Sequence, residues 1–219
     1  MIFEKVKGWV SCLAPDGMDR LLNKKNGTLM DGVLNIVISS IVPAATILMI
    51  FIVQAALGIT FSAFGGLAGL AAGGMTGTMY ILIGAVYAIA IIILSPVGFL
   101  LSNSLDWVMA RILGGKGKYS DQAFYESHLK AGSNILAPAL ILLAMIPCLG
   151  TLVSIGWTIY TIFLKYKIIK KVHSLSTLRA IGVIIIPIIL IITIVLALVI
   201  LLYGMLFASL LGLYGLGGR

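Results

Sequence analysis

Few residues of this chain are of the types that carry out chemistry, and their spacing matches no known catalytic motif. The two histidines, His128 and His173, lie far apart, and neither belongs to the H-E-x-x-H pattern that places two zinc ligands on one helix face. The run Gly-Gly-Lys-Gly-Lys at 114–118 suggests a phosphate-binding loop, but Tyr119 stands where that loop needs serine or threonine. The sequence therefore predicts no catalytic residue, no metal, no cofactor and a protein that is not an enzyme.

The composition excludes a water-soluble protein. Of the 219 residues, 61% are hydrophobic and 10% are charged, whereas a soluble domain carries about 25% charged residues. No Asp, Glu, Lys or Arg occurs at 32–105, 131–164 or 180–218. Because a charged side chain at the centre of a membrane helix costs about 2.5–3.5 kcal/mol, such gaps are typical of membrane-spanning segments. The sequence predicts an all-α, polytopic membrane helical bundle.

The three gaps divide into five predicted spans, because about 20 residues cross the bilayer. The two short spans form a hairpin that we expect to turn at Pro147 and Gly150, since proline removes a helix donor and glycine accepts a tight backbone. A Gly-rich segment, 58–78, connects the first two spans on the outer side. The predicted spans are about 33–57, 79–104, 131–146, 151–164 and 180–203.

The distribution of Lys and Arg sets the predicted orientation. Five lie in residues 1–31, four in 106–130 and five in 165–179, with Arg219 alone at the end. Five spans place the first three groups on one side, which the positive-inside rule identifies as the cytoplasm. A single bent helix in place of the hairpin would leave a smaller excess of Lys and Arg on the N-terminal side. An extra span in the Gly-rich segment would put the excess on the opposite side. We therefore expect a cytoplasmic N-terminus and a C-terminus outside.

Two regions follow from this topology. Residues 1–31 form a cytoplasmic amphipathic N-terminal segment, and residues 32–219 form the five-span membrane domain. Apolar residues at helical spacing in 2–13 predict a short helix, which either lies in the membrane interface or packs as a cap on the bundle. Cys12 falls inside and Cys148 outside, so the two cysteines cannot form a disulfide or share a metal.

The most basic predicted loop is 165–179, which contains no acidic residue. Each Lys or Arg near the surface contributes about 1 kcal/mol to attraction by anionic lipid. This loop is therefore our candidate site for anionic headgroups of the cytoplasmic leaflet, or for a protein partner, and nucleic acid is not expected. Its basic residues are Lys165, Lys167, Lys170, Lys171 and Arg179.

A glycine repeat in the outer segment predicts close helix packing. Gly65, Gly69, Gly73 and Gly77 recur every four residues, so on a helix they would form a glycine zipper along one face, where a second backbone could approach. That face could support a homo- or hetero-oligomer with other membrane proteins or a re-entrant segment. A loop without regular structure is an equal alternative, because glycine weakens a helix by about 1 kcal/mol per residue.

No predicted span carries an ionisable residue at its centre, which argues against proton-coupled transport, voltage sensing and intramembrane aspartyl proteolysis. Polar residues on the early spans include Ser39, Gln54, Ser95 and Asn103. They leave open a passive transporter or channel for a small solute or lipid.

Several short motifs in 105–190 resemble, in their order and spacing, the Yip domain family (Ypt/Rab-interacting proteins). The start of the chain, Glu4–Trp9, is similar to that of the family's short prokaryotic members. The resemblance covers the whole chain in architecture and about 85 residues in motif detail. The motifs are Leu113-Gly114-Gly115-Lys116-Gly117, Ala137-Pro138, Ile146-Pro147 with Gly150, Ile155–Tyr160, His173–Ser176 and Arg179–Ile181.

The resemblance implies a five-span membrane protein with a cytoplasmic N-terminus. Eukaryotic members act in vesicle traffic of the ER and Golgi, bind Rab-type GTPases and pair with one another, but they carry a long cytosolic N-terminal region. This chain reaches its first span after about 31 residues, so GTPase binding is implied by the family alone. We expect a non-enzymatic scaffold or a partner- or lipid-organising protein, in the plasma membrane of a prokaryote or, in a eukaryote, the ER or Golgi membrane.

Overall fold

The computed structural model describes residues 2–23, 27–57, 77–144, 146 and 148–215, and the side chains up to residue 205. These residues form seven helices and no strand, which confirms the all-α prediction. The helices are α1 (Ile2–Ser11), α2 (Pro15–Leu22), α3 (Leu29–Leu57), α5 (Gly77–Ile112), α6 (Tyr119–Ala144), α7 (Leu149–His173) and α8 (Thr177–Gly215).

Four helices in the described part of the chain are long and apolar enough to cross a membrane: α3, α5, α7 and α8. They support the prediction of an integral membrane protein. The first twelve residues of α6 are largely polar (YSDQAFYESHLK), and α6 does not belong to this group. Five spans and the sidedness of the two ends therefore stay predictions.

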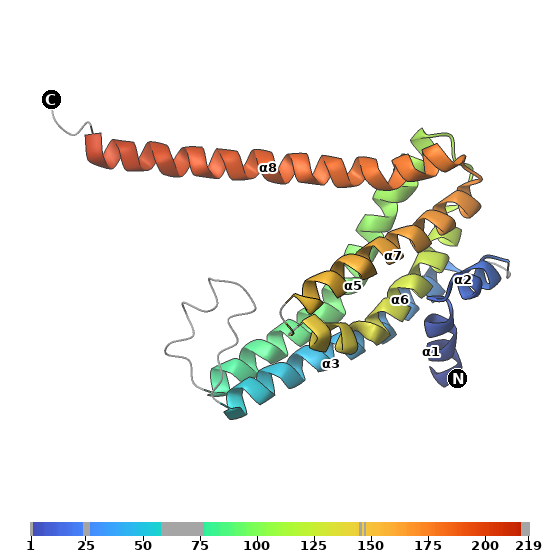
Figure 1. The fold of residues 1–219 in the computed structure, drawn as a ribbon, viewed down its shortest axis with the longest axis horizontal. Coiled ribbons are helices and arrows are strands. Elements are labelled where there is room, and N and C mark those ends of the chain that lie inside the picture. Colours follow the sequence, from blue (N-terminus) through green and yellow to red (C-terminus); the bar gives the residue numbers. More distant parts are fainter. Residues whose placement is uncertain (1, 24–26, 58–76, 145, 147, 216–219) are drawn as a thin grey trace.

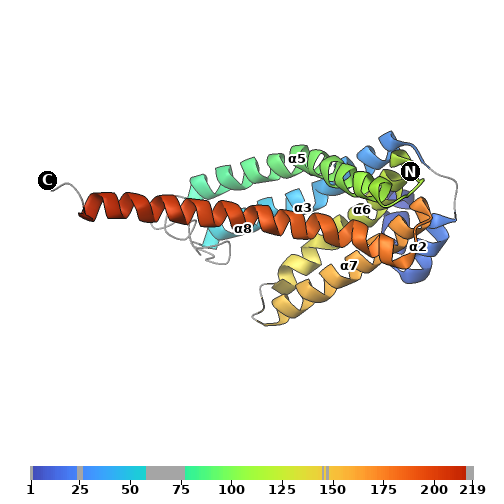
Figure 2. The same cartoon turned by 90° about the horizontal axis from the view of Figure 1, so that it is seen from above.

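The helices α3, α5, α6 and α7 pack side by side, and α8 departs from them (Figures 1 and 2). The helix α3 packs against α5 and α6, and α7 packs against α6. The first turns of α8 contact α5 and α7, through Ala180, Val183 and Ile184 against Ala110 and Ile169. Beyond this contact α8 projects alone, and every residue from Ile188 to Met205 is exposed. This long apolar surface is suited to lipid.

Local sequence signals fix where the first membrane helix begins. Thr28 precedes α3, and its Oγ1 accepts a hydrogen bond from the backbone N–H of Asp31 at 3.2 Å. In return the Asp31 carboxylate accepts from the backbone N–H of Thr28 at 2.9 Å. This reciprocal pair is a capping box that satisfies otherwise unpaired backbone donors. It starts the helix just before the charge-free gap, so the polar cap precedes the apolar span.

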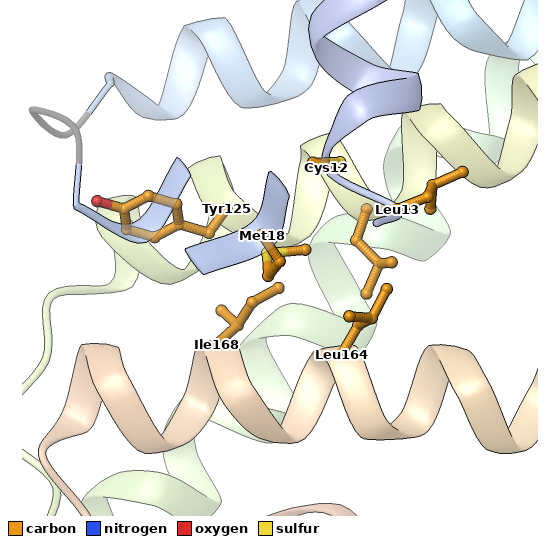
Figure 3. Close-up of a cluster of buried hydrophobic side chains, with 7 residues drawn as sticks. Cys12, Leu13, Met18, Tyr125, Leu164 and Ile168 are labelled. Carbon is orange, nitrogen blue, oxygen red and sulfur yellow. The ribbon is translucent and has the colours of Figure 1, made fainter. Parts of the chain in front are cut away.

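The N-terminal segment packs as a cap on the bundle. Trp9 is 1% exposed, and a buried cluster joins the α1–α2 corner to α6 and α7 (Figure 3). A Cβ on Gly132 of α6 would lie 2.5 Å from the Trp9 carbonyl oxygen, so only glycine lets α1 approach this closely. Ile2 and Phe3 remain exposed. The cluster consists of Cys12, Leu13, Met18, Tyr125, Leu129, Leu164 and Ile168.

The glycine repeat and the predicted hairpin turn lie only partly within the described residues. Gly65, Gly69, Gly73 and Pro147 lie outside the described residues. Gly77 begins α5, and a Cβ there would lie 3.4 Å from the Ala55 carbonyl oxygen of α3. Gly150 is buried in the first turn of α7, where a Cβ would come within 2.6 Å of Ala144 backbone atoms. The glycine-zipper prediction therefore stays a prediction.

Candidate functional site

Three charged side chains from three helices meet at one end of the bundle. The Lys165 ammonium of α7 forms an ion pair with the Asp106 carboxylate of α5, and its Nζ lies 3.8 Å from Oε2 of Glu126 on α6. The Asp106 and Glu126 side chains are only 6% and 8% exposed. We call these three residues the ionic cluster. Because its members come from different helices, the cluster ties α5, α6 and α7 together.

Neutral polar side chains complete the ionic cluster. The Gln122 Nε2 group donates a hydrogen bond to Glu126 Oε1 at 2.9 Å, and Asn103 Nδ2 lies 3.4 Å from Glu126 Oε2. The side-chain amide oxygen of Gln122, Oε1, is 2.7 Å from His173 Nε2, and the Nε2–H group donates the hydrogen bond in this arrangement. Buried charges are stable in proteins when they are paired and hydrogen-bonded in this way. The network connects the C-terminal part of α5, the N-terminal part of α6 and the C-terminal part of α7.

The connection between α5 and α6 lies against the end of α7. The backbone N–H of Lys116 donates to the His173 carbonyl oxygen at 3.3 Å. A Cβ on Gly117 would lie 2.6 Å from the Val172 carbonyl oxygen, so the approach requires glycine. The Gly-rich run that suggested a phosphate-binding loop is therefore occupied by contacts with α7.

Burial changes the proton affinity of Glu126 on α6, which precedes the predicted span 131–146. Removal from water raises the pKa of Glu126 to about 7, although Lys165 opposes the shift. The shift follows from the cost of holding a charge away from water. Lys130, one turn further along α6, is exposed.

A polar cavity of about 490 Å³ opens beside the ionic cluster between α5, α6 and α7. We call it the α5–α6–α7 cavity. One end is charged, and the walls carry hydroxyl groups; Phe99, Leu129 and Trp157 are its apolar lining residues. Its polar lining consists of Ser95 and Ser102 from α5, Glu126, Lys130 and Ser133 from α6, and Thr161 and Lys165 from α7.

The basic residues predicted to form one loop occupy three different places. Lys165 belongs to the ionic cluster, and Arg179 lies near the turn at Gly114. The other three, Lys167, Lys170 and Lys171, line an open cavity of about 550 Å³ together with Tyr166 and Ser174. We call these three lysines the basic surface. The predicted loop is largely helical, because α7 continues to His173 and α8 begins at Thr177.

Two of the three lysines of the basic surface have partners. The Lys167 ammonium forms an ion pair with Asp19 of α2 at 3.0 Å. The Lys170 ammonium donates to the Tyr166 hydroxyl at 3.2 Å and to Thr177 Oγ1 at 3.1 Å. These contacts hold the lysines around the cavity instead of leaving them to extend into solvent. The arrangement can bind a phosphate or carboxylate group.

Sequence reasoning did not single out Asp106, Glu126 or Gln122, and it named Asn103 only as a polar residue of an early predicted span. A signal was present, because Asn103 and Asp106 are three residues apart and Gln122 and Glu126 are four apart, which places each pair on one helix face. The described residues contain no group of three His, Cys, Asp or Glu that could hold a metal ion.

Comparison of the chain with protein families, curated proteins and solved structures found no match in any of the three.

Proposed function

We propose that this chain is a non-enzymatic integral membrane protein of the Yip type that organises anionic lipid through its basic surface. The observation that carries the proposal is the convergence of Lys167, Lys170 and Lys171 on one open cavity. Ser174 lines the same cavity, and its hydroxyl group can donate a hydrogen bond to a phosphate oxygen. The family assignment and its link to trafficking factors rest on the sequence resemblance alone, as does GTPase binding.

The proposed topology puts the basic surface at the level of the lipid headgroups. Five spans with the N-terminus inside put the end of α7 on the cytoplasmic side, next to the headgroups of the inner leaflet. Lys170 and Lys171 near that surface supply about 1 kcal/mol each in attraction to anionic lipid, and Lys167 supplies less because Asp19 pairs with its charge. A protein partner with an acidic surface is the alternative occupant, and association with other copies or other membrane proteins is compatible with either.

A binding titration tests the lipid proposal. The variant Lys167→Glu/Lys170→Glu/Lys171→Glu is expected to bind phosphatidylglycerol at least about tenfold more weakly than the wild type, since the attractions of Lys170 and Lys171, about 1 kcal/mol each, are reversed. Native mass spectrometry of the detergent-solubilised protein, titrated with this lipid, measures the change.

The matched control changes the net charge equally at other exposed lysines. Lys7, Lys116 and Lys118 are exposed and do not line the cavity of the basic surface, so Lys7→Glu/Lys116→Glu/Lys118→Glu is expected to retain most of the binding. Equal loss in the two triple variants would show a non-specific charge effect and contradict the proposal.

The second candidate function is passive passage of a small solute or lipid. The α5–α6–α7 cavity favours it, because its volume of about 490 Å³ and polar lining could accept a small molecule. Flux from proteoliposomes loaded with a panel of solutes tests it, and the absence of any flux would exclude it for that panel.

A further inference from the structure

The charges on the wall of the α5–α6–α7 cavity are of both signs and are separated. Three charged residues line the cavity, Glu126, Lys130 and Lys165, and the Lys165 ammonium is already paired with Asp106, so Glu126 and Lys130 remain for a ligand. Lys130 lies four residues after Glu126 on α6, which corresponds to about 6 Å along the helix axis. Both residues line the cavity, yet Lys130 forms no ion pair with any described residue. A ligand that complements this wall carries one positive and one negative group.

The depth of the cavity matches that of a lipid headgroup under the proposed topology. Lys130 directly precedes the predicted span 131–146, and Lys165 directly follows the predicted span 151–164. Trp157 and Ser95 also line the cavity. Trp157 precedes Lys165 by eight residues, which corresponds to about 12 Å along the α7 axis. The charged end therefore lies at the cytoplasmic headgroup level and the hydroxyl-lined end extends towards the hydrocarbon.

Under the proposed topology, the cavity opens between α5 and α7 towards the bilayer. Both α5 and α7 pack against α6; the Asp106–Lys165 ion pair joins them to each other, and they otherwise pack little together. The helix α8 bridges them only through its first turns and then projects away (Figures 1 and 2). Polar groups that face hydrocarbon are costly unless they are satisfied, and under the proposed topology this applies to the hydroxyl-lined end of the cavity. A lipid that enters between α5 and α7 would fill the charged end with its headgroup and leave its acyl chains in the bilayer.

We propose that the α5–α6–α7 cavity binds an aminophospholipid, with the phosphate against Lys130 and the amine against the carboxylate of Glu126. The Ser102 hydroxyl then donates to a phosphate or glycerol oxygen, whereas the Ser133 and Thr161 hydroxyls already donate to the Leu129 and Thr158 carbonyl oxygens of their own helices. The cavity volume, about 490 Å³, lies within the range of about 300–1,000 Å³ that ligand pockets occupy. The inference rests on the proposed topology but not on the basic surface, which is a separate site for anionic lipid.

The test is a titration of the purified protein with phosphatidylethanolamine, read by native mass spectrometry. The variant Lys130→Gln is expected to bind this lipid at least about tenfold more weakly, because one charge-assisted contact is removed. It is expected to bind phosphatidylglycerol like the wild type, since the basic surface is unchanged. The control Lys118→Gln, at an exposed lysine outside the cavity, is expected to bind both lipids like the wild type.

A second variant and a soluble ligand make the test decisive. Ser102→Leu places an apolar side chain in the cavity and is expected to weaken phosphatidylethanolamine binding as well. Free phosphoethanolamine is expected to compete poorly, because it lacks the acyl chains that partition into the bilayer. Unchanged phosphatidylethanolamine binding by folded Lys130→Gln would overturn the inference. Competition by free phosphoethanolamine as strong as that by the lipid would also overturn it, by indicating a site for soluble zwitterions.

Discussion

Replacing Lys165 with methionine is expected to lower the free energy of unfolding by about 3–5 kcal/mol, the range measured when one partner of a buried ion pair is removed. The substitution preserves most of the side-chain volume but leaves Asp106 and Glu126 buried without their cation. Unfolding by denaturant titration in bicelles measures the loss. The matched control is Lys171→Met, an exposed lysine on the same helix, which is expected to change the stability by less than about 0.5 kcal/mol.

Removing all three charges of the ionic cluster together distinguishes charge pairing from packing. The variant Asp106→Asn/Glu126→Gln/Lys165→Met is expected to be more stable than Lys165→Met alone, because no uncompensated charge remains buried. If Lys165→Met is as stable as the wild type, the ionic cluster does not join the three helices. If the triple variant is no more stable than the single one, the loss comes from packing and the electrostatic account is wrong.

The two cysteines are expected to differ at least about a hundredfold in their rate of reaction with a maleimide, because the thiolate is the reactive form. Cys12 is 1% exposed, and its thiol donates to the Trp9 carbonyl oxygen at 2.9 Å. Burial raises the pKa of Cys12 to about 12. Cys148 is exposed between α6 and α7. The single-cysteine variants Cys148→Ser and Cys12→Ser, labelled in detergent at pH 8, give the two rates.

Denaturation provides the control for this contrast. In the unfolded chain both thiols are solvated, so the two rates are expected to become similar. Rapid labelling of Cys12 in the native protein would show that the α1–α2 corner does not stay packed on α6 and α7, contrary to the structure.

The apolar helices could be predicted from the sequence because lipid imposes a local rule. A charge within the hydrocarbon is costly wherever it occurs, so the charge-free gaps mark α3, α5, α7 and α8 without knowledge of their neighbours. The helices nevertheless extend beyond the gaps, as α5 does through Asp106 to Ile112. These extensions carry the polar residues of the ionic cluster, which the gap analysis assigned to loops.

The different environments of the lysines could not be predicted from their number. On one helix, Lys165 faces α5 and α6 whereas Lys167 and Lys170 line the open cavity beside α2. The direction of each side chain depends on the helical phase relative to partners that are distant in the sequence. Pairing Lys165 with Asp106 requires knowing that α7 packs near α5, and that is a tertiary property. The same holds for Trp9, which is buried because Gly132 of α6 leaves room for α1.

The sidedness of Cys148 tests the central claim most directly, namely that α6 and α7 cross the membrane as a hairpin and leave the basic surface in the cytoplasm. The Cys12→Ser protein, with Cys148 as its one thiol, is labelled in intact cells with a membrane-impermeant maleimide. A companion variant, Cys12→Ser/Cys148→Ser/Ser176→Cys, carries its thiol at an exposed position in the α7–α8 connection.

We predict that Cys148 is labelled in intact cells and that the thiol introduced at position 176 is labelled only after the membrane is permeabilised. This result would place the α6–α7 turn outside and the basic surface inside. Labelling of both thiols under the same condition would show that α7 does not separate them across the membrane. Labelling of Cys148 only after permeabilisation, with position 176 labelled in intact cells, would invert the topology and remove the cytoplasmic basic surface.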